Sequence, residues 1–406
     1  MTTRVLSQLP NDREHNAHYA ELREAGPVHR IVLPDGAPIW LVTRYDDVRA
    51  ALSDERLALD PRELSSPRHK FGGKRVPGDI LASSGRHMLN TDGDEHRRLR
   101  SLVYNELTAG AVTRWRPGVE TVVEAQLDEL AERAGNEPVN LMPVFANAVP
   151  AAVIGMVLGI APDDMSIAAR LIRELLTDRK PDSPEMIGWY HELIDLILAT
   201  VKRKRARPGA DLISSVLSRP EKVGDRDLLS TIMALLVGGP PTTATTLAYG
   251  TVLLSGEPEL AQRVVDDSDA AASLIEELLR HHAPFPFASW RFATEDLELG
   301  GIRVPKDATV LLSLTTANRD PRKYANADKL CPGRTDKPTH LSFGNGAHRC
   351  VGASLARLEL GIALPALFRR FPDLELAVAP DELVWTTFLF DRRLESLPVW
   401  PRGRLG

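Results

Sequence analysis

Residues 343–352 carry the sequence Phe343-Gly344-Asn345-Gly346-Ala347-His348-Arg349-Cys350-Val351-Gly352, and a helical pattern follows over 351–371. The glycines of this segment permit a tight loop whose backbone approaches a flat ligand closely. The start of the following helix stabilises an anion, which places Cys350 to be a thiolate. A lone cysteine is ordinarily interpreted as an inert, buried thiol. The surrounding pattern favours a ligand instead.

This loop resembles the haem-binding loop of the cytochrome P450 family, in which a phenylalanine, two glycines, a basic residue and the ligand cysteine recur at this spacing. The resemblance runs from 25–28 to 397–399 and so covers nearly the whole chain. It implies that Cys350 is the proximal ligand of the iron of haem b, with Phe343 and Gly352 in the cofactor-binding loop. An anionic sulfur ligand pushes electron density onto the iron and favours O–O cleavage.

Hydrophobic periodicity predicts a mainly α protein with a smaller β-rich part. Apolar residues recur at helical spacing through 95–107, 112–133, 161–177, 189–206, 226–255 and 258–283. Short strands are expected in the portions 28–45, 290–313 and 373–400, and a long irregular loop over 318–349. Length alone allows two or three domains. The resemblance instead implies one domain over residues 1–406 with the cytochrome P450 fold.

Composition excludes several classes of function. The net charge of −5 makes no electrostatic case for a nucleic-acid partner or an anionic membrane. The first ten residues lack the apolar core of a secretory signal, and no apolar stretch reaches the roughly 18 residues of a membrane span. Two cysteines, Cys331 and Cys350, are too few for a disulfide scaffold. A cytoplasmic protein is therefore expected.

Four donor or cationic side chains are expected, from the resemblance, to hold the two propionates of the haem. His96 and Arg100 lie four residues apart at the start of a predicted helix, so they share one face. Arg291 and His348 match further propionate-binding positions of the family. Convergence of these groups is reasonable because a buried carboxylate is costly without partners.

A second set of residues is expected to support the haem loop without entering the reaction. Glu277 and Arg280 lie three residues apart on a predicted helix and match the buried Glu-x-x-Arg pair of the family. Arg334 matches the arginine that joins this pair. Taken alone, such a pair is more often a surface feature. Cys331 falls at a variable loop position and is interpreted as a bystander thiol.

The predicted central helix departs from the family where it faces oxygen. Residues 235–246 match the helix that crosses the haem, with Gly239 leaving room for dioxygen or substrate and Thr242 as the alcohol of an acid–alcohol pair. Pro241 stands where the acid is expected. Neither Pro240 nor Pro241 has an N–H group, so the helix should kink and leave carbonyl groups free to hold water.

Three functions stay open. The first is a haem-thiolate monooxygenase that hydroxylates or epoxidises a small molecule in bacterial secondary-metabolite (antibiotic) biosynthesis, with protons arriving through Thr242, water or the substrate. The second is an oxidation such as phenol coupling or a peroxide-driven reaction, in which ordinary proton delivery matters less. The third is a haem-binding protein with little oxygenase activity. The pathway assignment depends on family resemblance alone.

The substrate pocket is expected to include Ala234, Gly238, Phe285, Phe287, Phe388 and Leu389. Aromatic side chains there would suit an aromatic or polyketide-like substrate, free or linked to a carrier. Arg392 or Arg393 is a candidate partner for a carboxylate or a carrier phosphate, although a surface position is the preferred interpretation.

Partners follow from the same resemblance. A fold that uses the whole chain leaves no room for a flavin or nicotinamide domain. Electrons are therefore expected from a ferredoxin and its reductase, with Arg349 and Arg334 as candidates for a basic docking patch. The protein is expected to be a monomer.

Overall fold

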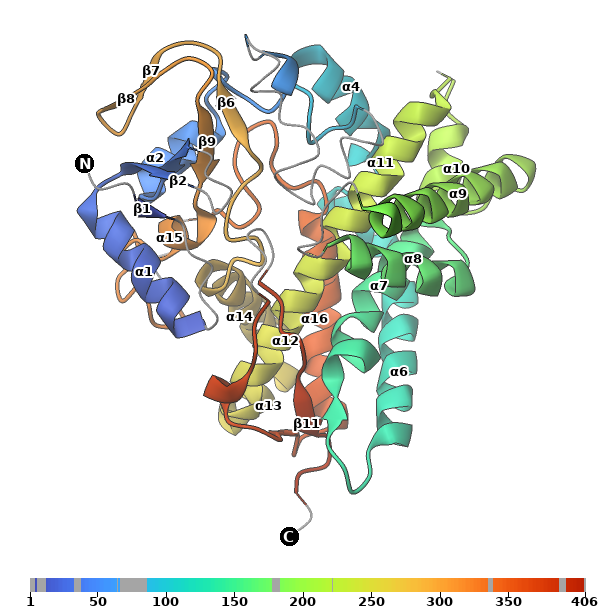
Figure 1. Cartoon of the computed structure of the whole chain (residues 1–406). Helices are drawn as coiled ribbons and strands as arrows, with labels where there is room; N and C mark the ends of the chain where they lie inside the picture. The colour runs from blue at the N-terminus through green and yellow to red at the C-terminus, as the bar shows by residue number, and fades with distance from the viewer. Residues whose placement is uncertain are drawn as a thin grey trace.

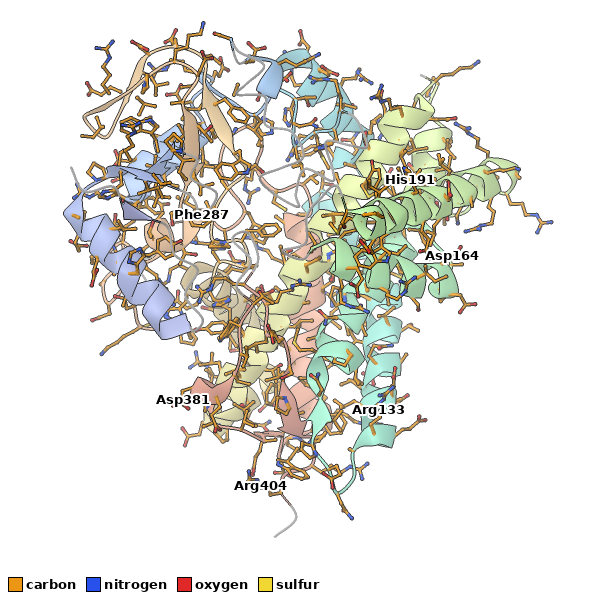
Figure 2. All side chains as sticks on the ribbon, in the orientation of Figure 1. Arg133, Asp164, His191, Phe287, Asp381 and Arg404 are labelled. Atoms are coloured by element: carbon orange, nitrogen blue, oxygen red, sulfur yellow. The ribbon has the colours of Figure 1, made fainter. Side chains whose placement is uncertain are left out.

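The computed structural model describes residues 4–5, 12–32, 38–63, 65, 86–176, 183–220, 222–334, 339–386 and 392–404. A larger helical region and a smaller region around the main sheet lie side by side (Figure 1). The fold is mainly α, with 57% helix and a smaller sheet part, as predicted. Charged side chains such as Arg133 point outward from the helical region, whereas Phe287 lies inside the molecule (Figure 2).

The helices follow the amphipathic stretches of the sequence. They are α1 (Asp12–Ala25), α2 (Tyr45–Leu52), α4 (Gly93–Tyr104), α5 (Ala109–Val112), α6 (Arg116–Arg133), α7 (Ala148–Leu158), α8 (Pro162–Leu175), α9 (Pro184–Ala206), α10 (Leu212–Leu217), α11 (Asp225–Gly238), α12 (Pro240–Ser255), α13 (Pro258–Asp266), α14 (Ser268–His281), α15 (Leu314–Asn318) and α16 (Ala353–Arg370). Short helical turns are η1 (Pro61–Glu63), η4 (Thr113–Trp115), η5 (Met142–Ala146) and η6 (Pro380–Glu382).

The single helix predicted over 258–283 is wrong in one respect, because it is divided into α13 and α14 at Asp267. The carboxylate Oδ1 of Asp267 accepts hydrogen bonds from the backbone N–H groups of Asp269 (2.8 Å) and Ala270 (3.3 Å). An aspartate that caps a helix in this way satisfies donors that would otherwise have no partner. The cap starts α14, which carries Glu277 and Arg280.

The three β-rich portions predicted from the sequence contain most of the strands. The strands are β1 (Arg4–Val5), β2 (Val28–Val32), β3 (Pro38–Val42), β4 (Leu57–Ala58), β5 (Val139–Asn140), β6 (Arg291–Ala293), β7 (Leu297–Leu299), β8 (Ile302–Val304), β9 (Thr309–Leu312), β10 (Glu375–Leu376) and β11 (Pro398–Trp400). The main sheet has the order β1-β2-β3-β9-β6-β4, a smaller sheet the order β10-β11-β5, and β7 pairs with β8. Pairing of β6 with β9 places Arg291 opposite Val310.

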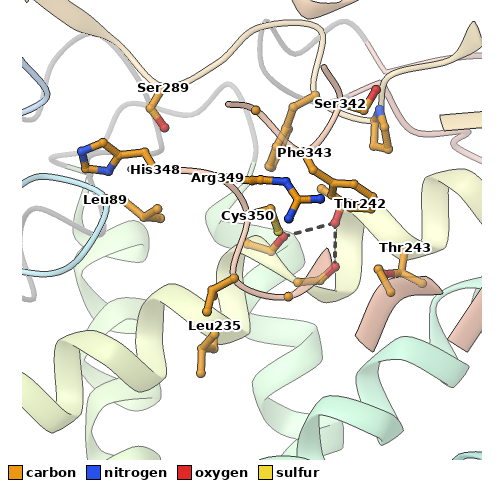
Figure 3. Close-up of a pocket in the computed structure, with 18 of the residues that line it drawn as sticks. Leu89, Leu235, Thr242, Thr243, Ser289, Ser342, Phe343, His348, Arg349 and Cys350 are labelled. Carbon is orange, nitrogen blue, oxygen red and sulfur yellow. Dashed lines mark hydrogen bonds between the residues drawn. The ribbon is translucent and has the colours of Figure 1, made fainter. Parts of the chain in front are cut away.

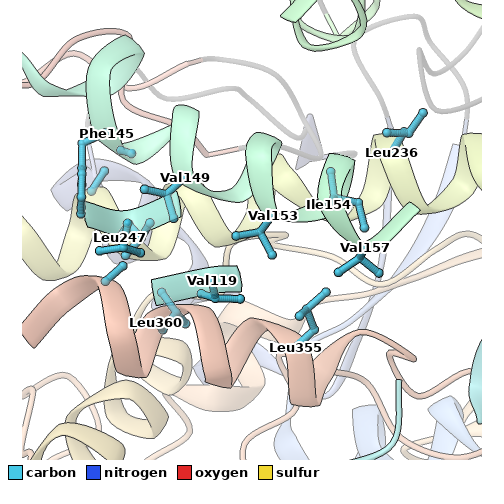
Figure 4. Packing of buried hydrophobic residues seen from close by; sticks show 14 of the residues in the cluster. Val119, Phe145, Val149, Val153, Ile154, Val157, Leu236, Leu247, Leu355 and Leu360 are labelled. Atoms are coloured by element: carbon cyan, nitrogen blue, oxygen red, sulfur yellow. The ribbon is translucent and has the colours of Figure 1, made fainter. Parts of the chain in front are cut away.

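Helix α16 follows the cysteine loop and packs against α6, α12, α13 and α14. The contact is apolar, since Val119 of α6, Val153 of α7 and Leu360 of α16 are completely buried (Figure 4). Burial of a side chain of this size contributes roughly 1.5–3 kcal/mol relative to exposure. The cysteine loop is therefore attached to a firmly packed helix.

The central helix is interrupted at the two prolines, as predicted. Helix α11 ends at Gly238 and α12 begins at Pro240, with Gly239 between them at φ −88° and ψ −70°. The expectation that no run is long enough to cross a membrane is wrong for Asp225–Ser255 taken as one unit. This run passes that test by length and composition, but 72% of its apolar window is buried inside the protein, as in a core helix.

Candidate active site

The segment 343–352 forms a tight loop that leads into α16. Gly344 and Gly346 have φ angles of 70° and 74°, in the left-handed region that favours glycine. The backbone N–H of Cys350 donates to the carbonyl oxygen of Phe343 at 2.7 Å. A Cβ atom on Gly346 would lie 2.8 Å from the Oγ of Ser53, so the loop packs directly on the end of α2.

The loop forms one wall of a cavity that is bounded opposite by the interrupted central helix (Figure 3). Among residues expected at the cofactor, the cavity is lined by Arg100, Arg291, Phe343, His348, Cys350 and Gly352. Among those expected at oxygen and substrate, it is lined by Ala234, Gly238, Gly239, Thr242, Phe285 and Phe287. Phe388 and Leu389 lie outside the described residues.

Arg100, Arg291 and His348 line this cavity, and His96 lies next to His348. His96 is 3% exposed and stacks on His348, with ring centroids 4.0 Å apart. Within the described chain, Nε2 of His96, Nδ1 of His348 and Nε of Arg291 have no hydrogen-bond partner. The Nη2 of Arg100 donates to the carbonyl oxygen of Arg349 at 2.6 Å. An anionic group placed here would satisfy donors that are otherwise costly to bury.

Burial also sets the protonation of these donors. It lowers the pKa of His96 to about 4, with further contributions from the charges of His348 and Arg100. It lowers the pKa of Arg291 to about 10, against an opposing contribution from Asp92. At neutral pH, His96 is therefore a neutral donor and Arg291 a buried cation. Both states suit a carboxylate ligand.

The sulfur of Cys350 is exposed, and the space that it faces is the cavity. Burial of the loop raises the pKa of this thiol, whereas the Gly352 N–H and the charges of Arg100 and Arg349 act in the opposite direction. Burial thus opposes the thiolate that the start of α16 is expected to stabilise, and that expectation stays a prediction. Coordination to a metal deprotonates a thiol outright, so the thiolate state depends on the metal.

The expected support network beneath the loop is present. Arg280 donates from Nε and Nη2 to the two carboxylate oxygens of Glu277, each at 2.8 Å, and both side chains are buried. Nε of Arg334 lies 3.3 Å from Oε1 of Glu277. Arg280 also donates to three backbone carbonyl groups, those of Asn318, Ala327 and Lys329. The network thus connects α14 to the long irregular loop.

The structure places Cys331 and the two arginines that were expected to form a docking patch. The backbone N–H of Cys331 donates to Oε1 of Glu277 at 2.8 Å, so this residue takes part in the network through its backbone. The side chain of Arg334 is only 8% exposed. Arg349 lines the cavity beside Cys350 (Figure 3). Arg334 is therefore too buried for a docking patch, whereas Arg349 is exposed and stays a candidate.

Thr242 is held at the interruption of the central helix. Its hydroxyl donates to the carbonyl oxygen of Gly239 at 2.8 Å and approaches that of Gly238 at 3.2 Å (Figure 3). The hydrogen of the hydroxyl is thus engaged with the backbone, while its oxygen can still accept. A Cβ on Gly239 would lie 2.9 Å from the carbonyl oxygen of Leu235, which explains a glycine at the break.

The structure adds residues that the sequence analysis missed. Asp92 accepts a hydrogen bond from Nε2 of His348 at 3.0 Å and so orients that ring. Thr243 and Glu359 also line the cavity. Glu359 had a signal in the sequence, because it lies between the buried Leu355 and Ala363 at helical spacing and so interrupts an apolar stripe. The surface position preferred for Arg392 is wrong, since it is 5% exposed.

Comparison with known proteins agrees with this geometry. The family model described as Cytochrome P450 matches residues 167–386. A 6-deoxyerythronolide B hydroxylase of Saccharopolyspora erythraea is 36% identical over 394 residues, which cover 94% of each chain.

Solved structures agree as well. The cytochrome P450 PksS of the Bacillus subtilis 168 bacillaene polyketide synthase has a TM-score of 0.85 at 33% identity, covering 95% of this chain and 96% of its own. The tirandamycin C-bound P450 monooxygenase TamI has a TM-score of 0.84 at 32% identity, covering 98% and 99%. Cavity, cysteine loop and relatives lead to one conclusion: the chain belongs to the cytochrome P450 family, whose cofactor is haem.

Proposed function

We propose that this protein binds haem b through Cys350 and hydroxylates or epoxidises a small, polyketide-like molecule in bacterial secondary metabolism. The observation that carries the proposal is one cavity lined both by a cysteine on a tight loop and by Arg291 and His348, each of which has a buried nitrogen atom without a partner in the described chain. A porphyrin matches both sets of groups, because its iron can bind the cysteine and its two carboxylates can bind the buried nitrogen atoms. All 406 residues are proposed to form one domain.

Two groups of residues hold the two parts of the haem. Cys350 holds the iron, and His96, Arg100, Arg291 and His348 hold the propionates. Bound haem supplies the reduction of dioxygen and the transfer of one oxygen atom. The Phe343 carbonyl fixes the backbone of the cysteine at 2.7 Å, and this contact orients the ligand before any cofactor arrives.

On the opposite side of the cavity, Gly239 has no side chain and would leave space for dioxygen or substrate beside a bound cofactor. Thr242, whose hydroxyl hydrogen is engaged with the backbone, presents its oxygen as an acceptor. Substrate contacts are proposed for Ala234, Phe285 and Phe287, and for Phe388 and Leu389, which follow from the family resemblance alone. An apolar cavity with a few hydroxyl groups suits a reduced polyketide.

The relatives support the substrate class and the electron donor. One is named for hydroxylation of 6-deoxyerythronolide B, and another belongs to a polyketide synthase. Family members take electrons from a separate redox partner, and a ferredoxin with its reductase is proposed here. A cytoplasmic monomer that acts on a free or carrier-linked substrate completes the proposal.

Two spectra and one isotope experiment test this function. The ferrous protein with CO should show the absorption band of a thiolate-ligated haem, and Cys350→Ser should lose that band. A macrolactone library should contain a compound that shifts the haem spectrum, and ¹⁸O₂ should label its product. A product without label would contradict the monooxygenase assignment.

A second candidate reaction has its own observation. Pro241 occupies the position of the usual acid, which favours a peroxide-driven oxidation because peroxide brings its own protons. Turnover with hydrogen peroxide that exceeds turnover with dioxygen and a reduced ferredoxin would support this candidate over the first.

A further inference from the structure

Arg357 of α16 contacts the cysteine loop through Phe343. Its guanidinium carbon lies 4.6 Å from the centroid of the Phe343 ring. A cation over the face of an aromatic ring is attracted by the negative charge of that face. The carbonyl oxygen of Phe343 in turn accepts the hydrogen bond from the backbone N–H of Cys350 (Figure 3). Arg357 therefore touches the residue that fixes the backbone of the cysteine.

A carboxylate on α14 holds Arg357 in this place. Arg357 donates from Nε to Oε1 of Glu276 at 2.6 Å and from Nη2 to Oε2 at 2.8 Å. Such a bidentate pair fixes the plane of the guanidinium as well as its position. Glu276 is adjacent to Glu277 in the chain. Helix α14 thus supplies one acid to the support network beneath the loop and another to Arg357.

His340 donates a further hydrogen bond to Glu276. Its Nδ1 accepts from the backbone N–H of Ser342 at 3.2 Å, so Nε2 carries the hydrogen and donates to Oε2 of Glu276 at 3.2 Å. Burial acts to raise the pKa of Glu276, but the hydrogen bonds from Arg357 and His340 outweigh it and lower this pKa to about 2. At neutral pH, Glu276 is therefore the anionic partner of a cationic Arg357.

The charge of Arg357 also acts on the sulfur of Cys350. Burial raises the pKa of this thiol, and the charges of Arg100, Arg349 and Arg357 act in the opposite direction. Among these three arginines, Arg357 is the one that the described residues provide with a bidentate carboxylate partner. Its net effect on the sulfur is therefore set by two side chains with opposite charges.

We propose that Arg357 and Glu276 are positioning residues that set the reduction potential of the haem iron, because Arg357 holds a positive charge beside the cysteine ligand and Glu276 partly neutralises it. The inference rests on the proposed ligation of haem by Cys350. In the reduction, ferric iron takes up one electron, and one reduced ferredoxin is oxidised. The charge at the site falls by one, which a nearby positive charge favours and a nearby negative charge opposes.

The test is a redox titration of the haem-loaded protein with small-molecule mediators, followed by its absorption spectrum, so that docking of ferredoxin plays no part. At the potential where wild type is half reduced, we expect the ferrous-to-ferric ratio to be at least about threefold lower in Arg357→Gln and at least about threefold higher in Glu276→Gln. Arg357→Lys keeps the positive charge and should stay within about twofold of wild type.

The matched control is Arg370→Gln on the same helix. Arg370 also donates to a carboxylate, that of Asp128 at 3.0 Å, but it lies at the far end of α16 from the cysteine loop. This variant should leave the ratio unchanged. Resonance Raman spectra of the ferric protein give a second readout. Loss of the positive charge should strengthen donation by the sulfur and raise the iron–sulfur stretching frequency in Arg357→Gln, whereas Glu276→Gln should lower it.

A shift of the ratio in the same direction in both glutamine variants would overturn the proposal, because a loss of packing acts alike in both, whereas removal of opposite charges does not. A ratio in Arg357→Lys as low as in Arg357→Gln would also overturn it. If Arg357→Gln fails to bind haem, Glu276→Gln decides alone, and a ratio that is not raised overturns the proposal. Failure of the proposed haem ligation would look different, because wild type itself would then lack the thiolate CO band.

Discussion

At the residue scale, the buried bidentate pair between Glu277 and Arg280 is the central contact of the network that connects α14 to the long irregular loop. We expect Arg280→Lys to lower the free energy of unfolding by about 3–5 kcal/mol. Lysine cannot form two parallel bonds to the carboxylate, and it leaves Glu277 and the loop carbonyl groups without their buried donors. Urea unfolding measures the change. The control Arg56→Lys, at an exposed pair with Asp54, should change the free energy of unfolding by less than about 0.5 kcal/mol.

His281 makes the stability of the protein dependent on pH. Its Nε2 lies 2.9 Å from the carbonyl oxygen of Asp328, so Nε2 carries the hydrogen and Nδ1 accepts from the Tyr249 hydroxyl at 2.7 Å. Burial, and then the charge of Arg319, lower the pKa of His281 from 6.5 to about 2. The unfolded chain takes up a proton below pH 6.5 that the folded chain does not, so stability falls as the pH drops through that value.

We therefore expect wild type to lose up to about 2 kcal/mol more unfolding free energy than His281→Gln between pH 7 and pH 5. Glutamine has no titrating group, and its amide can still donate to Asp328. Urea unfolding at the two pH values gives the comparison. Equal losses in both proteins would show that His281 accepts a proton in the folded state.

At the scale of elements, Pro240 and Pro241 mark the junction of α11 and α12. They do not lie in the middle of one continuous helix. Pro240 and Pro241 occupy the first turn of α12, where a missing N–H costs little. We expect the double variant Pro240→Ala, Pro241→Ala to change the free energy of unfolding by less than about 1 kcal/mol. Leu236→Ala, one turn earlier and completely buried, should cost about 2–5 kcal/mol. An increase of about 3 kcal/mol in the free energy of unfolding of the double alanine variant would show that the prolines interrupt a helix interior.

At the scale of the whole molecule, the cofactor and the fold stabilise each other. We expect removal of haem to lower the free energy of unfolding by about 3 kcal/mol or more, since a ligand at 100 times its Kd contributes roughly 2.7 kcal/mol. The Nε2 of His96, the Nδ1 of His348 and the Nε of Arg291 would again be buried without partners in the described chain. Thermal unfolding with and without haem measures this. The same Tm in both states would mean that the cavity is stable without its ligand.

Much of this arrangement is predictable from the chain. The cysteine loop, the helical stretches and the three β-rich portions follow local rules of spacing, turn chemistry and periodicity, and the structure contains each of them. The helix boundary at Asp267 was missed because a single cap residue decides it. Phe388 and Leu389 stay predictions, since they lie outside the described residues.

The sequence by itself determined the cofactor loop around Cys350 and the interruption of the central helix at Pro240, because glycine spacing and a missing N–H group act within a few residues. Only the tertiary structure decided which side chains lack partners in the cavity. It buried Arg334 beside Glu277, bonded the Thr242 hydroxyl to the backbone, and placed Glu359 without a partner opposite α12. Those outcomes depend on burial and on contacts between helices far apart in the chain, which no local pattern specifies.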